Sequence, residues 1–163
     1  MNQQNKSVRL TIPAHADFID IVRLSLYGIA IKMGFSYEDI EDMKVAVSEA
    51  CNNAVIHAYD EHELCHIDVH FEIQNDRIRI SIKDFGSSFN YEKAAEEADS
   101  LHDKQLSEVN IGGLGIFMMQ ALMDEVQVNN ETGTEVILTK LLNRTEGDKL
   151  YGLKTFPETK GTS

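Results

Sequence analysis

Cysteine is scarce in this chain, which contains only Cys51 and Cys65. Two cysteines are too few for the disulfide framework that stabilises small secreted domains. Together with the histidines between residues 57 and 70, they match none of the common ligand spacings of zinc sites. We therefore expect both cysteines to be reduced thiols with structural roles.

Long apolar runs are also missing. No run approaches the roughly 20 residues that a membrane-spanning helix requires, and no apolar signal segment follows the polar start Met-Asn-Gln-Gln-Asn-Lys. We therefore expect a cytoplasmic protein that does not interact with a membrane. The 163 residues, 42% hydrophobic and 26% charged, suit one ordinary globular domain with a proper core.

Basic residues are in the minority, with 15 lysines and arginines against 27 aspartates and glutamates and a formal net charge of −12. Affinity for nucleic acid comes largely from Lys and Arg contacts to phosphates, so this balance argues against direct nucleic-acid binding. A basic protein partner fits the charge better, although acidic residues also serve solubility.

Hydrophobic periodicity predicts strands and helices in a definite order. Apolar residues at every second position indicate half-buried strands, and those at three- and four-residue intervals indicate helices. Residues 87–111 lack a core pattern, which at this length is typical of a functional lid or a disordered loop. The predicted strands are 7–12, 65–73, one through Ile78, Ile80 and Ile82, 125–130 and 134–141, and the predicted helices are 15–33, Ser36 to about Ala58, and 114–124.

The second predicted helix carries polar groups where packing should require apolar ones. Glu49, Asn53 and His57 follow one another at four-residue steps and form one stripe, flanked by small alanines. One interpretation is a ligand site, because a carboxylate and a carboxamide would project together. The other is a solvated face with ordinary helical pairing, and this stretch alone leaves both open.

Two further polar groups share the parity of buried strand residues. Asp84 and Gly86 continue the inward-facing series of the preceding isoleucines, which would bury a carboxylate that then needs hydrogen bonds. Alternatively, the strand ends at Lys83 and the Asp-Phe-Gly sequence is only a turn. Thr134 shares the parity of the valine and leucine that follow it, and so adds a hydrogen-bonding group to the inner face.

A glycine-rich run precedes the third predicted helix. Gly112, Gly113 and Gly115, with Leu114 between them, would let the backbone approach a ligand, and the N–H groups at a helix start attract phosphate. The alternative is a flexible hinge before a packing helix. The run is not a Walker A loop, because no Gly-Lys-Ser/Thr follows, nor a dinucleotide fingerprint, because the required preceding strand is missing.

This order of elements predicts an α+β fold, a two-layer sandwich in which helices cover one face of a mostly antiparallel, mixed sheet. In that layout Glu49, Asn53, Asp84, Thr134 and the helix start at Gly112–Gly115 converge between the helices and the sheet. One pocket would then account for all of these polar groups.

Together the motifs resemble the histidine-kinase-like ATPase fold, which gyrase, the Hsp90 chaperone and histidine kinases share. Within that superfamily, the short chain and its two N-terminal helices are similar to the anti-sigma factor serine kinases, most closely the anti-sigma-B factor of the general stress response. The resemblance covers residues 7–142, and we expect one domain over 1–142 and a flexible tail over 143–163. The motifs that carry it are Glu49-x-x-x-Asn53-Ala54-x-x-His57-Ala58, Asp84-x-Gly86, Gly113-Leu114-Gly115 and Gly133-Thr134, with Val-Ser-Glu-Ala-Cys-Asn-Asn-Ala-Val-Ile-His-Ala-Tyr around the first.

The resemblance implies that the pocket binds ATP with Mg²⁺. Asn53 would be the Mg²⁺ ligand, Asp84 would accept the adenine amino group, Gly86 would make room for the base, and Thr134 would support the Asp84 end. Residues 87–111 would form a lid. The backbone N–H groups that would face the phosphates belong to Gly112, Gly113, Leu114 and Gly115.

The resemblance also implies a protein serine kinase, in which Glu49 is the general base that takes the proton from the substrate serine, while His57 stays structural. Kinases of this kind can carry a basic residue just ahead of the glycines; here the nearest is Lys104. The implied partners are a sigma-B-like sigma factor, held inactive to regulate transcription, an anti-anti-sigma protein as the phosphorylated substrate, and a second copy in a homodimer. The alternative is an ATP-dependent binding module without kinase activity. The presence of Glu49, the candidate general base, argues against this alternative.

Overall fold

The computed structural model describes residues 6–57, 65–86, 96 and 111–143. The first strand, β1 (Lys6–Pro13), ends at the proline, and a 3₁₀ turn (Ala16–Phe18) leads into α1 (Ile19–Met33). Gly34 ends α1 with a φ of 89°, a left-handed conformation that glycine adopts without strain, and its N–H donates back to the last turn. The predicted strand and helix are confirmed.

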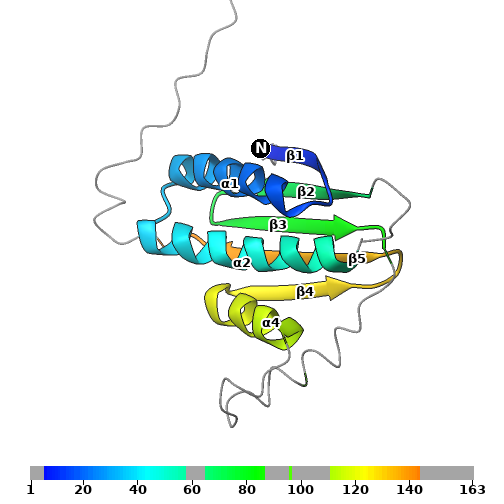
Figure 1. The fold of residues 1–163 in the computed structure, drawn as a ribbon. Coiled ribbons are helices and arrows are strands. Elements are labelled where there is room, and N and C mark those ends of the chain that lie inside the picture. Colours follow the sequence, from blue (N-terminus) through cyan, green and yellow to red (C-terminus); the bar gives the residue numbers. More distant parts are fainter. Residues whose placement is uncertain (1–5, 58–64, 87–95, 97–110, 144–163) are drawn as a thin grey trace, which may run out of the picture.

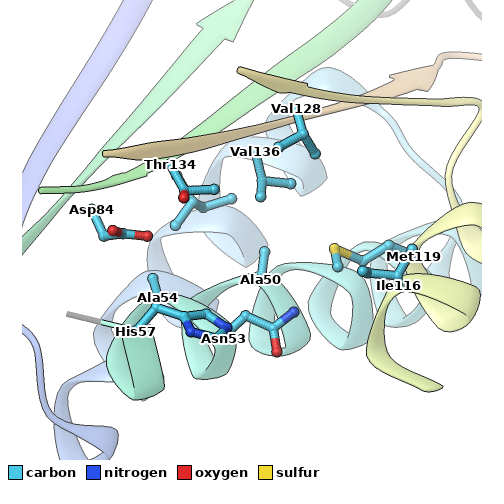
Figure 2. Close-up of a pocket in the computed structure, with 11 residues that line it drawn as sticks. Ala50, Asn53, Ala54, His57, Asp84, Ile116, Met119, Val128, Thr134 and Val136 are labelled. Atoms are coloured by element: carbon cyan, nitrogen blue, oxygen red, sulfur yellow. The ribbon is translucent and has the colours of Figure 1, made fainter. Parts of the chain in front are cut away.

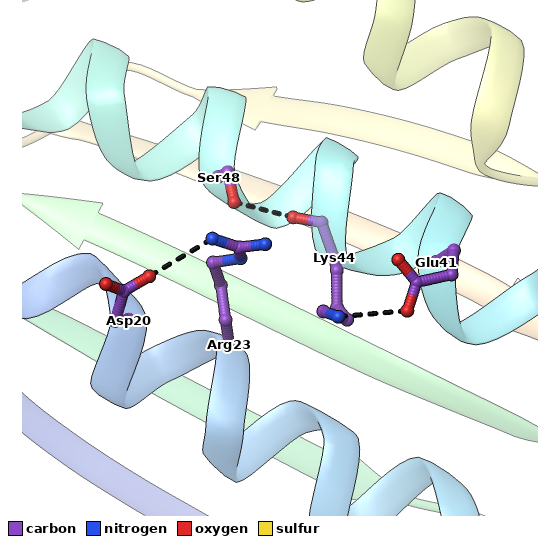
Figure 3. A network of polar contacts seen from close by, with 5 residues as sticks. All are labelled: Asp20, Arg23, Glu41, Lys44 and Ser48. Atoms are coloured by element: carbon purple, nitrogen blue, oxygen red, sulfur yellow. Dashed lines mark hydrogen bonds and ion pairs between the residues drawn. The ribbon is translucent and has the colours of Figure 1, made fainter.

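The helix that carries the polar stripe is α2 (Tyr37–His57). Its start is set by Ser36, whose Oγ accepts a hydrogen bond from the Asp39 N–H at 3.1 Å. Figure 3 shows Arg23 of α1 and Lys44 of α2 extending toward the neighbouring helix, and each pairs with an acid of its own helix, Asp20 and Glu41. Buried apolar side chains supply the rest of the contact between the two helices.

Two hairpins supply most of the sheet. The strands β2 (His66–Ile73) and β3 (Arg77–Asp84) form the first, and β4 (Glu125–Asn129) and β5 (Thr134–Leu141) form the second. Alternate residues of β2 and β3 are buried, as their period of two predicts. The second hairpin follows α4 (Ile111–Leu122).

The five strands that the structure describes lie in the order β1-β2-β3-β5-β4. The hairpin of β4 and β5 returns so that β5 enters between β3 and β4, opposite in direction to both. Every strand pair among these residues is therefore antiparallel, and the predicted mixed sheet is a wholly antiparallel one here. The α+β class itself is confirmed.

Helices α1 and α2 cover one face of this sheet, and α4 lies beside α2 over β4 (Figure 1). The apolar core fills the space between the two layers, so any polar residue on the inner face of a strand must find partners there. No helix in the described part of the chain is long and apolar enough to cross a membrane.

Two sequence predictions fall mainly on residues that the structure does not describe. The predicted lid at 87–111 lies outside the described residues except at Glu96 and Ile111, and the predicted tail lies outside them from residue 144 onwards. Both stay predictions.

Candidate functional site

The polar stripe of α2 lies beside a pocket that α2, α4 and the sheet enclose. Asn53 and His57 line it, and Ala50 and Ala54 lie on the same side (Figure 2). Both alanines are buried, and their small side chains leave room between helix and strands. Asn53 and His57 are half-buried and border this pocket, which favours the ligand-site interpretation of the stripe. His57, which the resemblance leaves structural, thus borders the same pocket as Asn53.

Opposite α2, Asp84 occupies the last position of β3. The strand does not end at Lys83, and the carboxylate is buried, with an exposed fraction of 2%. Its Oδ1 accepts a hydrogen bond from the Gly86 N–H at 3.1 Å, and the Thr134 N–H also donates to it. Burial raises the pKa of the Asp84 carboxyl above its ordinary value, while these two bonds and nearby His57 act in the opposite direction.

Thr134 begins β5 directly beside Asp84, its partner across the ladder, and it is buried. The turn before it depends on Gly133, whose φ is 71°. A Cβ atom at Gly133 would lie only 2.1 Å from the backbone oxygen of Asp84. Only glycine fits at this position, because the backbone conformation is left-handed and there is no space for a Cβ atom. The turn that Gly133 allows brings the end of β3 at Asp84 and the start of β5 at Thr134 together.

The glycine run lies inside α4 and not ahead of it, because α4 begins at Ile111, whereas the sequence pattern predicts a start at 114. Packing against α2 overrides the poor helix propensity of glycine at these positions. In a helix that starts at Ile111, the N–H groups of Gly112 and Gly113 have no intrahelical acceptor. That the N–H groups of all four residues, Gly112 to Gly115, face phosphates stays a prediction.

Gly115 makes a different contribution, because its lack of a side chain lets α4 approach α2 closely. A Cβ atom there would lie 2.9 Å from Glu49 Oε2, and 3.7 and 3.8 Å from the side-chain nitrogen and oxygen of Asn53. The first turns of α4 are thus packed directly on the polar stripe of α2. This contact joins the predicted carboxylate and carboxamide to the predicted helix start.

The remaining walls of the pocket are apolar. The space between its walls, open solvent at the mouth included, is about 360 Å³. Periodicity places Ile82, Val128 and Val136 on the inner faces of their strands, but it does not show how far along the layer a cavity lies, so these residues were missed as site residues. Ile116 and Met119 were missed altogether, because the sequence pattern assigns the apolar face of this helix to Leu114, Phe117 and Met118, whereas Ile116 and Met119 are the buried residues. The apolar lining comes from the sheet and α4 and consists of Ile82, Val128, Val136, Ile116 and Met119.

The predicted site residues thus fall into three places. Asn53, Asp84 and Thr134 line the pocket itself. Glu49 and Gly115 meet beside it, where α2 and α4 touch, and Gly86 holds the Asp84 carboxylate from the adjoining loop. Gly112 and Gly113 lie in the first turn of α4, and Leu114 is partly exposed there.

Known proteins are similar to this chain in sequence and in fold. Residues 12–140 match the histidine kinase-like ATPase domain family. A serine-protein kinase RsbW of Oceanobacillus iheyensis is 42% identical over 86% of this chain and 90% of its own length. The RsbW serine-protein kinase of Bacillus subtilis is 39% identical over 91% of this chain and 94% of its own length.

Two solved structures share the fold at low sequence identity. One contains the RsbU and RsbW domains of Rv1364c from Mycobacterium tuberculosis, with a TM-score of 0.62 and 24% identity over 86% of this chain and 33% of that one. The other is the SiaB-SiaC complex from Pseudomonas aeruginosa, with a TM-score of 0.59 and 14% identity over 82% of this chain and 88% of that one. Since the matching domain spans most of the described residues and the RsbW relatives align along nearly their whole length, the chain belongs to the RsbW serine-protein kinases of the histidine kinase-like ATPase family.

Proposed function

We propose that this kinase binds ATP with Mg²⁺ in the pocket between α2 and the sheet, and transfers the terminal phosphate to a serine of an anti-anti-sigma protein. The observation that carries the proposal is that three features lie in and directly beside one pocket. A buried carboxylate, Asp84, lies at one end; a carboxamide and a carboxylate, Asn53 and Glu49, lie towards the other; and the start of α4 is packed on that second end.

The Asp84 end suits the adenine base. The base is flat and apolar on its faces, and the walls of Ile82 and Val136 offer matching surfaces. Its exocyclic amino group needs an acceptor, which the Asp84 carboxylate supplies. Because the N–H groups of Gly86 and Thr134 already hold that carboxylate, it is oriented before the ligand arrives.

The Asn53 end suits the phosphates and their metal ion. Mg²⁺ prefers oxygen ligands and takes few from protein when phosphates and waters supply the rest, so one carboxamide oxygen on the pocket wall fits it. When bound, the ion would neutralise charge on the transferring phosphoryl group. The N–H groups of Gly112 and Gly113, at the positive end of the α4 dipole, would face the phosphates.

Glu49 is the residue for proton transfer. One turn of α2 separates it from Asn53, so a base and a metal ligand project to the same side. In phosphoryl transfer, most of the catalytic effect comes from positioning and charge neutralisation, with a carboxylate orienting the attacking hydroxyl and taking its proton. Glu49 would play that part for the substrate serine.

Purified protein incubated with Mg²⁺, labelled ATP and the anti-anti-sigma protein of the same genome tests these roles. We expect label on a serine of that protein. Glu49→Ala should abolish the transfer but keep ATP bound, and Asn53→Ala should weaken binding of Mg-ATP. Asn52→Ala, an exposed neighbour on the same helix, is the matched control and should change neither. Transfer at the native rate by Glu49→Ala would remove the base assignment, and unchanged affinity in Asn53→Ala would remove the metal ligand.

The proposal extends to the regulatory partners. We propose that the protein acts in the cytoplasm as a homodimer, that it holds a sigma-B-like sigma factor inactive, and that the anti-anti-sigma substrate competes for it. Membership of the RsbW kinases and the excess of negative charge support this proposal. A binding module that uses ATP only as a ligand is the second candidate, and ATP binding without transfer to any serine would favour it.

A further inference from the structure

A lysine is buried at the far end of the helix layer from the Asp84 carboxylate. Lys140 lies near the end of β5, on the inner face of the sheet, with an exposed fraction of only 9%. Its Nζ donates a hydrogen bond to the backbone oxygen of Leu122, the last residue of α4, at 2.7 Å. The same Nζ lies 3.6 Å from Asp39 Oδ1 and 3.9 Å from Asp42 Oδ2, both in the first turns of α2.

The chemistry of this contact explains why a buried charge is tolerated. An ammonium group has three N–H donors, and here it has a carbonyl and two carboxylates around it. A cation at the carboxyl end of one helix and acids at the amino end of another are both favourable to the helix dipoles. Lys140 therefore connects the end of α4 to the start of α2. Its buried ammonium group would be costly to leave unpaired, whereas the two aspartates that face it are only partly buried.

Two other hydrogen bonds hold the end of α4, but neither reaches α2. The Asp124 N–H donates to the Thr139 oxygen at 3.0 Å, and the Leu141 N–H donates to Asp124 Oδ2 at 2.7 Å. Both attach the turn after α4 to β5. Lys140 instead adds a polar connection between α4 and α2, the two helices that border the candidate site.

The two helices run in opposite directions, so this contact and the site lie at opposite ends of the same interface. At one end Lys140 joins Leu122 to α2; at the other, Gly115 packs on Glu49 and Asn53. The seven residue-to-residue steps from Gly115 to Leu122 span about 10 Å of helix, over which an α-helix moves as a nearly rigid rod. A shift of α4 along α2 at the Lys140 end would therefore be passed to the Gly115 end.

We infer that Lys140 is a positioning residue for the nucleotide site: by fixing the end of α4 on the start of α2, it sets where the amino end of α4 meets Glu49 and Asn53. This inference rests on the proposed function, because the geometry that it preserves is that of the proposed phosphate end. Phosphoryl transfer depends on such alignment, and a misplacement of about 1 Å can cost about a hundredfold in rate.

The test compares Lys140→Met, Lys140→Arg and the double variant Asp39→Asn/Asp42→Asn with a matched control. The control is Lys44→Met, which removes an ion pair of 2.9 Å to Glu41 that stays within α2 (Figure 3). Affinity for Mg-ATP is measured by calorimetry at a temperature where melting curves show each variant to be folded. Hydrogen exchange of the segment 111–122 without nucleotide is the second readout.

We expect Lys140→Met to weaken Mg-ATP binding well beyond the twofold margin set for the control, and to speed exchange in the first turns of α4. Lys140→Arg should recover most of the affinity, and Lys44→Met should stay within about twofold of the native protein, since an ion pair inside one helix does not set its neighbour's position. A purely structural lysine would lower the melting temperature and leave the affinity of the folded protein unchanged.

The double variant keeps the test valid if Lys140→Met does not fold, because it retains the bond from Lys140 to Leu122 and removes only the charges on α2. It should weaken Mg-ATP binding in the same direction. Native affinity in both variants would overturn the inference and leave the proposed function intact. Failure of the native protein itself to bind ATP would refute the proposed function and the inference together.

Discussion

The substitution Gly115→Ala should slow phosphoryl transfer by this kinase without lowering its stability. An alanine Cβ at that position would lie 2.9 Å from Glu49 Oε2, and ordinary contact begins at 3.4 Å, so the carboxylate must move by about 0.5 Å. The Asn53 amide atoms, at 3.7 and 3.8 Å, can stay where they are. The substitution therefore disturbs the proposed base and spares the proposed metal ligand.

The effect on stability should be neutral or favourable. Alanine is preferred over glycine within a helix by up to about 1 kcal/mol, and the end of a glutamate side chain can move at little cost. For a chain of this length the gain corresponds to a rise of about 2–4 °C in melting temperature. The rate of serine phosphorylation should nevertheless fall by about tenfold, because a displacement of 1 Å costs about a hundredfold.

Gly28→Ala is the matched control for this substitution. Gly28 lies in α1 and a Cβ atom there would meet nothing within 4 Å, so alanine should stabilise the helix and leave phosphorylation unchanged. Thermal denaturation, Mg-ATP affinity and the single-turnover rate of transfer are measured on both variants. A Gly115→Ala protein that keeps native affinity and phosphorylates at the native rate would refute the argument that the close approach of α4 places Glu49.

Three further predictions concern the buried groups. Because burial raises the pKa of Asp84, its ionised form destabilises the folded protein, and Asp84→Asn should have a higher melting temperature at pH 7. This gain should shrink as the pH falls through the raised pKa towards the ordinary value of about 3.9. The Mg-ATP affinity of Asp84→Asn should fall by about tenfold or more. A lower melting temperature for Asp84→Asn at pH 7 would contradict this. Gly133 has a φ of 71° and no space for a side chain beside the Asp84 backbone, so Gly133→Ala should lower the free energy of unfolding by about 2 kcal/mol or more and the melting temperature by several degrees. An unchanged melting curve would show that the turn relaxes freely. Burial raises the pKa of the Cys51 thiol to about 12, so an aromatic disulfide reagent should react with Cys65 in the native protein and with Cys51 only on unfolding, and rapid reaction of both would be the opposite result.

The sequence predicts the sheet and the first two helices well because their signals are local. Period-two isoleucines mark β3, and the same parity assigns Asp84 and Thr134 to the inner face, where both are buried. Ser36 and Gly34 mark the helix boundaries through their own hydrogen bonding and backbone conformation. These are features that a few neighbouring residues decide.

What the sequence does not predict depends on contacts between distant segments. The start of α4 at Ile111 follows from packing on α2, which glycine propensity cannot reveal. The burial of Lys140 at the end of an otherwise ordinary strand depends on the carbonyl of Leu122 and on acids far earlier in the chain. The apolar walls of the pocket likewise come from separate elements, and only their meeting identifies them.

The place of β5 in the sheet also has a consequence for protein synthesis. The strand is made after the other four that the structure describes, yet it lies between two of them, and Thr134 pairs with an aspartate fifty residues earlier. Closing a loop of that length costs conformational entropy, and the contacts that offset this cost form only when the new strand is inserted. On the ribosome, the α2 side of the pocket is present early, but the pocket is completed only after Val136 has emerged. A chain that terminates before β5 would therefore lack Thr134 and Val136, and with them part of the proposed adenine site.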